Sequence, residues 1–172
     1  MPEAVFRRSA ASGLTPMARW LAAILACMPL ALRAAPLELP APRNLQQEAV
    51  EMARSDKPMV VLYSQSGCHW CEEARTYLVP MSREAGSRDA ALYRQIDLDS
   101  DAPLVDFQGR RGTQRSFAER ERVRFTPTVV VYGPRGERLA EPIVGMRLAD
   151  FYGQYLEQAI ATARERLNAV PR

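Results

Sequence analysis

The feature that most constrains this chain is a pair of cysteines, Cys68 and Cys71, that stands between an apolar run and a helical pattern. The run over residues 58–63 is typical of a buried strand, and residues 72–78 continue as a helix. Unpaired backbone N–H groups and the positive end of the dipole stabilise a thiolate at a helix N-terminus. The first cysteine is therefore predicted to be a nucleophile, and the second lies close enough to form a disulfide with it.

Hydrophobic periodicity predicts alternating helices and strands along the rest of the chain. The predicted elements are a helix over 44–55, a strand over 58–65, a helix over 69–84, a strand over 91–98, a helix over 116–122, strands over 128–132 and 137–144, and a helix over 147–167. Asn44 is the expected cap of the first helix, and Ser116 with Glu119 three residues later predicts a capping box. Pro80 is expected to kink the helix that follows the cysteines, and Gly86 to end it.

The N-terminus has the basic, apolar and small-residue regions of a secretory signal peptide, predicted over residues 1–35. Arg19 precedes the apolar stretch 20–32, and Ala34 and Ala35 follow it. This stretch is short and interrupted by proline, which is unfavourable for a membrane-spanning helix. The sequence therefore predicts an exported, periplasmic protein.

Two features leave the processing of this leader open. A start at Met17 gives a leader of more ordinary length, and residues 24–27 loosely resemble a bacterial lipobox. In the second case a lipidated Cys27 anchors the protein to the membrane, facing the periplasm. In either case the exported part is expected to comprise a linker over 36–43 and one domain over 44–172.

The charge pattern argues against nucleic-acid binding. The net charge of +3 comes from the leader, where four arginines face a single acid, and the rest of the chain is balanced. Neutralising phosphates requires an excess of basic side chains on one face. An arginine-rich stretch over 110–124 is interleaved with Glu119 and Glu121, which favours a solvated helix face and leaves a docking patch for an acidic partner as the alternative.

Other cysteine chemistry fits this sequence poorly, and no metal or organic cofactor is predicted. A structural zinc site needs about four ligands, whereas the exported part holds only Cys68, Cys71 and His69 as candidates. Covalent haem attachment requires histidine directly after the second cysteine, where this chain has Glu72. A cysteine hydrolase needs a base, and His69 adjoins Cys68 too closely in sequence to act as one.

The order of elements, together with two motifs, resembles the thioredoxin fold. The motifs are Cys68-His69-Trp70-Cys71 and Phe125-Thr126-Pro127-Thr128. The resemblance covers residues 44–167 and implies an α/β fold in which a central mixed sheet is flanked by helices. It also implies that Pro127 is cis and lies across from the cysteines, and that Thr126 offers backbone atoms to an extended partner chain.

Further similarity is to the SoxW-like periplasmic thioredoxin-related proteins, in residues 105–109, 117–119 and 123–128. Those proteins carry an extra hairpin-like segment before the helix that leads to the cis-proline, so an insertion is expected there. The thioredoxin family has a buried acidic residue six positions before the first cysteine, where this chain has Leu62. Glu72, Glu73 or water is then left to accept the proton of the second thiol.

The predicted function is thiol–disulfide exchange with other exported proteins, with Cys68 as the attacking thiolate and Cys71 as the resolving thiol. The SoxW-like resemblance favours a reductase that receives electrons from a membrane donor. A disulfide-donating oxidase and a binding module with a structural disulfide remain alternatives. His69 is either a simple exposed residue or a charge that lowers the pKa of Cys68. Trp70 either contacts the partner chain or packs over the disulfide.

Overall fold

The computed structural model describes residues 37–146 and 149–169. The predicted signal peptide over 1–35, with Cys27, lies outside the described residues, so export and lipid anchoring stay predictions. None of the described helices is both long enough and apolar enough to cross a membrane.

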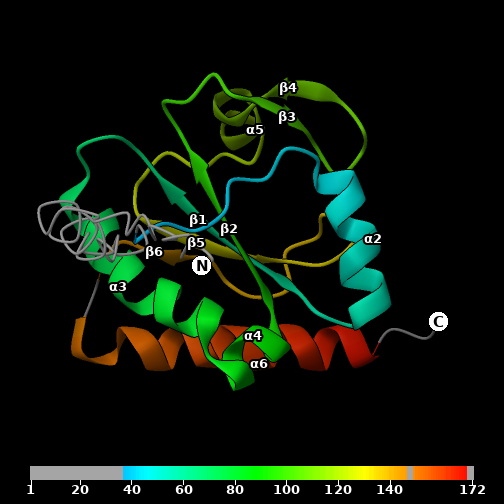
Figure 1. The fold of residues 1–172 in the computed structure, drawn as a ribbon, viewed down its shortest axis with the longest axis vertical. Helices are drawn as coiled ribbons and strands as arrows, with labels where there is room; N and C mark the ends of the chain where they lie inside the picture. The colour runs from blue at the N-terminus through cyan, green and yellow to red at the C-terminus, as the bar shows by residue number, and fades with distance from the viewer. Residues whose placement is uncertain (1–36, 147–148, 170–172) are drawn as a thin grey trace, which may run out of the picture. The chain divides into compact units, whose positions relative to one another are not determined.

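A mixed four-stranded sheet with the order β2-β1-β5-β6 forms the centre of the domain (Figure 1). Strand β1 (Met59–Ser64) pairs in parallel with β2 (Leu92–Asp97) and antiparallel with β5 (Thr128–Tyr132). The short strand β6 (Ile143–Val144) pairs antiparallel with β5 at the edge. The predicted fold class, a thioredoxin fold with a mixed sheet flanked by helices, is confirmed.

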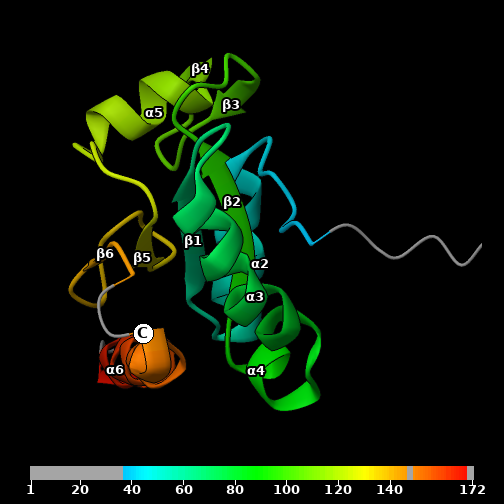
Figure 2. The same ribbon diagram turned by 90° about the vertical axis from the view of Figure 1, so that its left-hand side faces the viewer.

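Helices cover both faces of this sheet. Alternate residues of β1 point to opposite sides and are buried on both, so each face needs a covering layer. The covering helices are α2 (Leu45–Ser55), α3 (His69–Arg83), α5 (Gln114–Arg120) and α6 (Tyr152–Ala169). Val60 and Leu62 belong to the core beneath α3 and α6, whereas Val61 and Tyr63 belong to the core beneath α2 and α5. Figure 2 shows the sheet between α5 at one end and α6 at the other. Burial on both faces explains why β1 is a continuous apolar run rather than an alternating one.

Helix α2 begins and ends as predicted. The side chain of Asn44 accepts a hydrogen bond from the backbone N–H of Gln47 at 3.1 Å, which caps the helix. Its last residue, Ser55, is followed by Asp56 in the left-handed conformation, which turns the chain toward β1.

The prediction that Gly86 ends the cysteine helix is wrong. Helix α3 holds Pro80 and ends at Arg83, and Gly86 lies inside a second short helix, α4 (Ala85–Ala90). Glu84 between them has an extended backbone, with φ −66° and ψ 136°. Its carbonyl accepts the N–H of Arg88, so a new helix begins where the first one breaks.

An antiparallel pair, β3 (Pro103–Val105) and β4 (Arg111–Thr113), occupies the expected insertion before α5. The predicted cap, Ser116, is wrong: Thr113 caps α5, and its side chain accepts from the N–H of Ser116 while the Ser116 hydroxyl accepts from the N–H of Thr113. Both residues are good caps by type. Pairing of Thr113 with β3 holds its backbone extended, so the helix starts there.

The strand predicted over 137–144 is mostly irregular. A turn over 133–136 follows β5, but of the residues after it only β6 and an isolated bridge between Tyr132 and Arg138 pair with β5. Pro142 lacks the N–H that a strand needs, which interrupts the ladder. The last helix begins later than expected, because a 3₁₀ turn, η2 (Ala149–Phe151), precedes α6.

The segment predicted to be a linker packs on the domain. Leu39 is buried in the core beneath α3 and α6. The carbonyls of Pro40 and Arg43 accept hydrogen bonds from the N–H groups of Gln95 and Val105 at 3.1 and 3.0 Å. Residues 37–43 are thus part of the folded unit.

A fully buried carboxylate, Asp106, organises the β3–β4 turn. One oxygen accepts the backbone N–H groups of Gln108 and Arg110, and the other accepts the side chains of Arg110 at 2.7 Å and Arg120 at 3.3 Å. Burial raises the pKa of Asp106, but the hydrogen bonds from the backbone and side chain of Arg110 and from Gln108 outweigh it. The pKa of this carboxyl is therefore held below its usual range.

We expect Asp106→Asn to lower the free energy of unfolding by about 1–3 kcal/mol at pH 7, because an amide cannot accept from both arginines. A lowered native pKa gives stability that is present above the unfolded pKa and lost as the pH falls through the native value. The deficit should therefore shrink as urea denaturation is repeated from pH 7 down to about pH 3.

The matched control is Asp101→Asn, because Asp101 is an exposed carboxylate paired with Arg115 at 2.9 Å. Its effect should stay within about 0.5 kcal/mol. Equal effects of the two variants would contradict the role given to Asp106.

Candidate active site

The predicted site residues come together at the carboxyl end of β1. Ser64, the last residue of β1, pairs with Asp97 of β2, and Tyr63 pairs with Thr128 of β5. Because β5 runs antiparallel to β1, Thr128 begins β5 at the edge where β1 ends. Pro127 immediately precedes it. The cysteine loop after Ser64 and the start of β5 therefore lie at the same end of the sheet.

The Thr126–Pro127 peptide bond is cis. The carbonyl of Pro127 accepts a hydrogen bond from the N–H of Gly145 at 2.8 Å, which ties this turn to the chain after β6. Pro127 itself is buried, while Thr126 is partly exposed.

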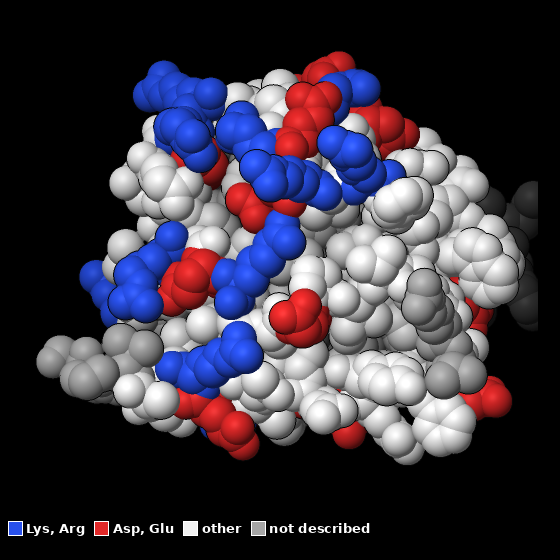
Figure 3. Space-filling model, turned by 180° about the vertical axis from the view of Figure 1, so that it is seen from behind, with Lys and Arg blue, Asp and Glu red and all other residues white. Residues whose placement is uncertain are grey.

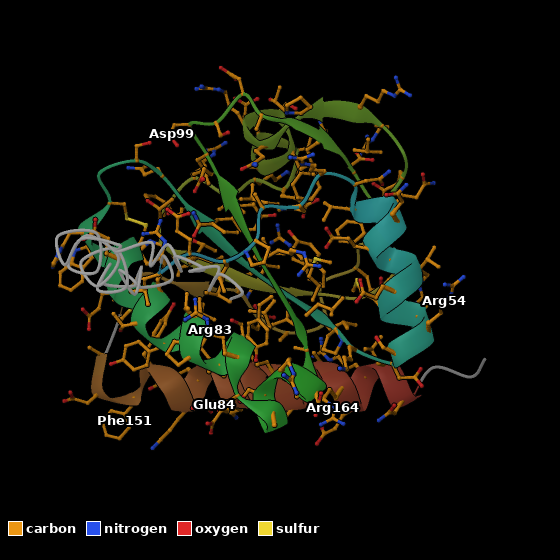
Figure 4. All side chains as sticks on the ribbon, viewed as in Figure 1. Arg54, Arg83, Glu84, Asp99, Phe151 and Arg164 are labelled. Carbon is orange, nitrogen blue, oxygen red and sulfur yellow. A yellow bond between two sulfur atoms is a disulfide. The ribbon has the colours of Figure 1, made fainter. Side chains whose placement is uncertain are left out.

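Cys68 and Cys71 are joined by a disulfide, with an S–S distance of 2.07 Å and a Cα–Cα distance of 5.2 Å. Figure 4 shows this bond in yellow at the start of α3. Cys68 is half-buried and Cys71 is fully buried. An attacking thiol of a partner can therefore reach the sulfur of Cys68 but not that of Cys71.

The start of α3 suits a negative charge on Cys68. Cys68 is the N-cap residue, and its Sγ accepts the backbone N–H of Cys71 at 3.1 Å. In the reduced protein this N–H and the positive end of the helix dipole favour a thiolate at that sulfur. The order of reactivity inferred from the sequence thus has a geometric basis.

His69 and Trp70 are both exposed beside the disulfide. Their ring centroids lie 5.3 Å apart, and 56% of Trp70 is accessible to solvent. An exposed indole at this position is free to contact a partner chain.

A polar pocket of about 250 Å³ lies on the open side of Cys68, and Glu38, Glu72 and Arg75 contribute to its wall. Arg75 stands seven residues after Cys68, so two helical turns place both on one face of α3. Leu62, at the family's acidic position, is instead buried in the apolar core.

Hydrogen bonds fix the guanidinium of Arg75 in this pocket. Its Nε donates to Gln95 at 2.9 Å and its Nη2 donates to the hydroxyl of Ser64 at 2.8 Å, while the Gln95 amide donates to Asp97 at 2.8 Å. A cation therefore lines the cavity that Cys68 borders. Sequence reasoning missed Arg75 and Glu38, and the helical spacing from Cys68 was the signal for Arg75.

The cysteine loop is anchored to the segment between β2 and β3. Asp99, labelled in Figure 4, accepts the backbone N–H of Ser66 at 3.0 Å. Hydrogen bonds from the Ser66 hydroxyl and N–H lower the pKa of Asp99. Arg115 donates to the Asp99 carbonyl at 2.8 Å and pairs with Asp101, so α5 helps to position this loop.

Within the described residues, no group of three or more His, Cys, Asp or Glu side chains is arranged to hold a metal ion.

A family model described as a thioredoxin-like domain matches residues 45–160. Among solved structures, a mutant of poplar thioredoxin h is 18% identical, with a TM-score of 0.52, over 83% of this chain and 95% of that chain. The reduced periplasmic thioredoxin SoxS from Paracoccus pantotrophus is 20% identical, with a TM-score of 0.44, over 62% of this chain and 99% of that chain. No curated protein matches the sequence. The poplar structure supports the fold described above.

After reduction, Cys68 should react with iodoacetamide at least about tenfold faster than Cys71 at pH 7, because it is more exposed and stabilised as a thiolate. Brief alkylation followed by peptide mass spectrometry measures both rates. Equal rates, or faster labelling of Cys71, would contradict this assignment of the nucleophile.

Replacing the cation in the pocket wall should also slow Cys68. We expect Arg75→Met to reduce the alkylation rate of Cys68 by roughly threefold at low salt, since a nearby positive charge favours the thiolate. Arg54→Met, on α2, is the control and should leave the rate unchanged. An unchanged rate in folded Arg75→Met would show that this guanidinium has only a structural role.

Proposed function

We propose that this chain, which belongs to the thioredoxin-like family, is an exported thiol–disulfide oxidoreductase that reduces disulfides in other periplasmic proteins. One observation carries the proposal: an accessible Cys68 is bonded to a buried Cys71 at a helix N-terminus, at the sheet end that also holds the cis Thr126–Pro127 bond. Export rests on the leader over 1–35, with a lipid anchor at Cys27 as the alternative.

In the first step, the Cys68 thiolate attacks one sulfur of a client disulfide. A new S–S bond forms between Cys68 and that sulfur, and the client's other sulfur leaves as a thiolate that takes up a proton. Thr126 and Pro127 are proposed to guide the extended client chain beside Cys68 during this attack. His69 and Trp70 flank the reacting sulfur and are proposed to tune it and to contact the client.

In the second step, Cys71 loses its proton and attacks Cys68. The mixed disulfide breaks, the client's remaining sulfur leaves as a thiolate, and the Cys68–Cys71 disulfide forms. Two electrons have passed to the client. A membrane dithiol donor then reduces the pair by the same exchange in reverse, so neither a metal nor an organic cofactor is needed.

The direction as a reductase rests on the SoxW-like resemblance. The hairpin of β3 and β4 before α5 supports it, since an extra segment at this place is a feature of those proteins. An oxidase runs the same two exchanges in reverse, and a binding module keeps the disulfide closed. The reduction potential of the pair separates these alternatives, because related sites span about −270 to −120 mV.

Cys71→Ser should trap clients as mixed disulfides, because the resolving thiol is missing and the bond to Cys68 persists. Expression with the leader in a bacterial host, followed by acid quenching and non-reducing gels, measures the trapped species. Cys68→Ser is the control and should trap few or none. Trapping by Cys68→Ser alone would exchange the roles of the two cysteines, and trapping by neither variant would contradict exchange activity.

A further inference from the structure

A second, smaller pocket lies next to the cis-proline turn and apart from the disulfide. It has a volume of about 130 Å³, and its wall includes Arg122, Arg124, Phe125 and Arg138. Thr128, which follows Pro127 and begins β5, also contributes. The pocket is therefore continuous with the chain segment at which a client strand is proposed to dock.

The arginines of this region differ in their ion pairs. Arg110 and Arg120 bind Asp106, and Arg115 binds Asp101. By contrast, Arg122 and Arg124 form no ion pair with any residue that the structure describes, and both are exposed. The arginine-rich stretch thus divides into a structural part, neutralised within the domain, and a part whose charge remains available.

The third arginine of the pocket is only partly neutralised. Arg138 contacts the carboxylate of Glu121 at 3.3 Å and also donates to the Glu121 carbonyl. Glu121 in turn accepts the hydroxyl of Tyr132 at 2.9 Å, so one carboxylate is shared between two donors. Three guanidinium groups and this single acid leave the pocket positive. Figure 3 shows the molecule from behind, where Lys and Arg side chains gather on one part of the surface with Asp and Glu side chains among them, beside a broad region with little charge.

Arg122 occupies a backbone conformation that is unusual for its type. Its φ is +58°, at the turn where α5 ends and Val123 donates its N–H to Ala118. Glycine or asparagine adopts this left-handed conformation at lower cost. A long basic side chain therefore stands where local stability favours a smaller residue.

Apolar surface adjoins the positive charge. Phe125, directly before Thr126, is 70% exposed, and Val144, paired with Thr128, is 47% exposed. An exposed phenylalanine at the rim of a pocket is a suitable contact for an apolar side chain of a partner. The surface beside the cis-proline thus combines the exposed ring of Phe125 with the guanidinium groups of Arg122 and Arg124, which form no ion pair with any described residue.

We propose that this pocket binds an acidic stretch of the client protein adjacent to the cysteine that Cys68 attacks. An apolar client residue packs on Phe125, and Asp or Glu side chains of the client bind Arg122 and Arg124. The inference rests on the proposed exchange activity and names the chemistry of its substrate: disulfides flanked by acidic rather than basic residues. Opposite charge accelerates encounter and fixes the register of the bound chain.

The test compares three peptide disulfides that differ only in flanking residues, which are Glu, Gln or Lys. The full domain from residue 37, reduced beforehand, is mixed with each peptide, and the second-order rate constant of this single-turnover reduction is measured at low salt and at 0.3 M salt. We expect the Glu peptide to be reduced about tenfold faster than the Lys peptide at low salt, with the preference falling as salt screens the charges.

Arg122→Asn combined with Arg124→Gln should reduce that preference to about twofold or less. Asparagine tolerates the left-handed backbone, so this variant is expected to fold. Arg111→Gln, on β4 and outside the pocket, is the matched control and should keep the preference.

The outcomes separate the two proposals. Equal reduction of all three peptides by the unmodified protein would overturn the acidic-client inference and leave the exchange activity intact. Loss of the preference in Arg111→Gln but not in the double variant would overturn the assignment to this pocket. No reduction of any peptide would overturn the proposed function and this inference with it.

Discussion

The structure depends on the burial of β1 on both faces and along both edges. All of its residues are buried, and it pairs with β2 on one side and with β5 on the other. Such a strand cannot slip by one residue without moving its side chains between the two cores. Its register therefore fixes which residues stand at its carboxyl end. The cysteine loop and the cis-proline turn lie at the same end of the sheet because of this pairing.

The site itself departs from the thioredoxin family pattern in its electrostatics. Leu62 contributes to the apolar core at the family's acidic position, and the polar groups instead lie on the open side of Cys68. There Arg75 is held by Ser64 and Gln95. The pocket that Cys68 borders thus holds the guanidinium of Arg75 together with the carboxylates of Glu38, Glu72 and Asp97, while Cys71 is fully buried. The partial exposure of Cys68 and its position at the N-terminus of α3 favour a reactive first thiol.

Sequence reasoning predicted the elements that have a single strong local signal. The buried strand β1, the cap at Asn44 and the start of α3 at the cysteines are of this kind. It erred where two signals compete: Thr113 and Ser116 are equally good caps, and only pairing with β3 decides between them. Arg75 was missed because its hydrogen-bond partners lie on β1 and β2, so that its helical spacing from Cys68 was the one local signal for it.

The β3–β4–α5 insertion connects the stability of the domain to the site. At one end Asp106 binds Arg110 and Arg120, which neutralises charge that would otherwise repel within α5 and the hairpin. In α5, Arg115 donates a hydrogen bond to the carbonyl of Asp99, and the Asp99 carboxylate accepts the N–H of Ser66 in the cysteine loop. Where α5 ends, the chain turns through Arg122 toward the cis-proline. A segment that extends the fold therefore supports the cysteine loop through Arg115 and Asp99 and carries the exposed Arg122 next to the cis-proline turn.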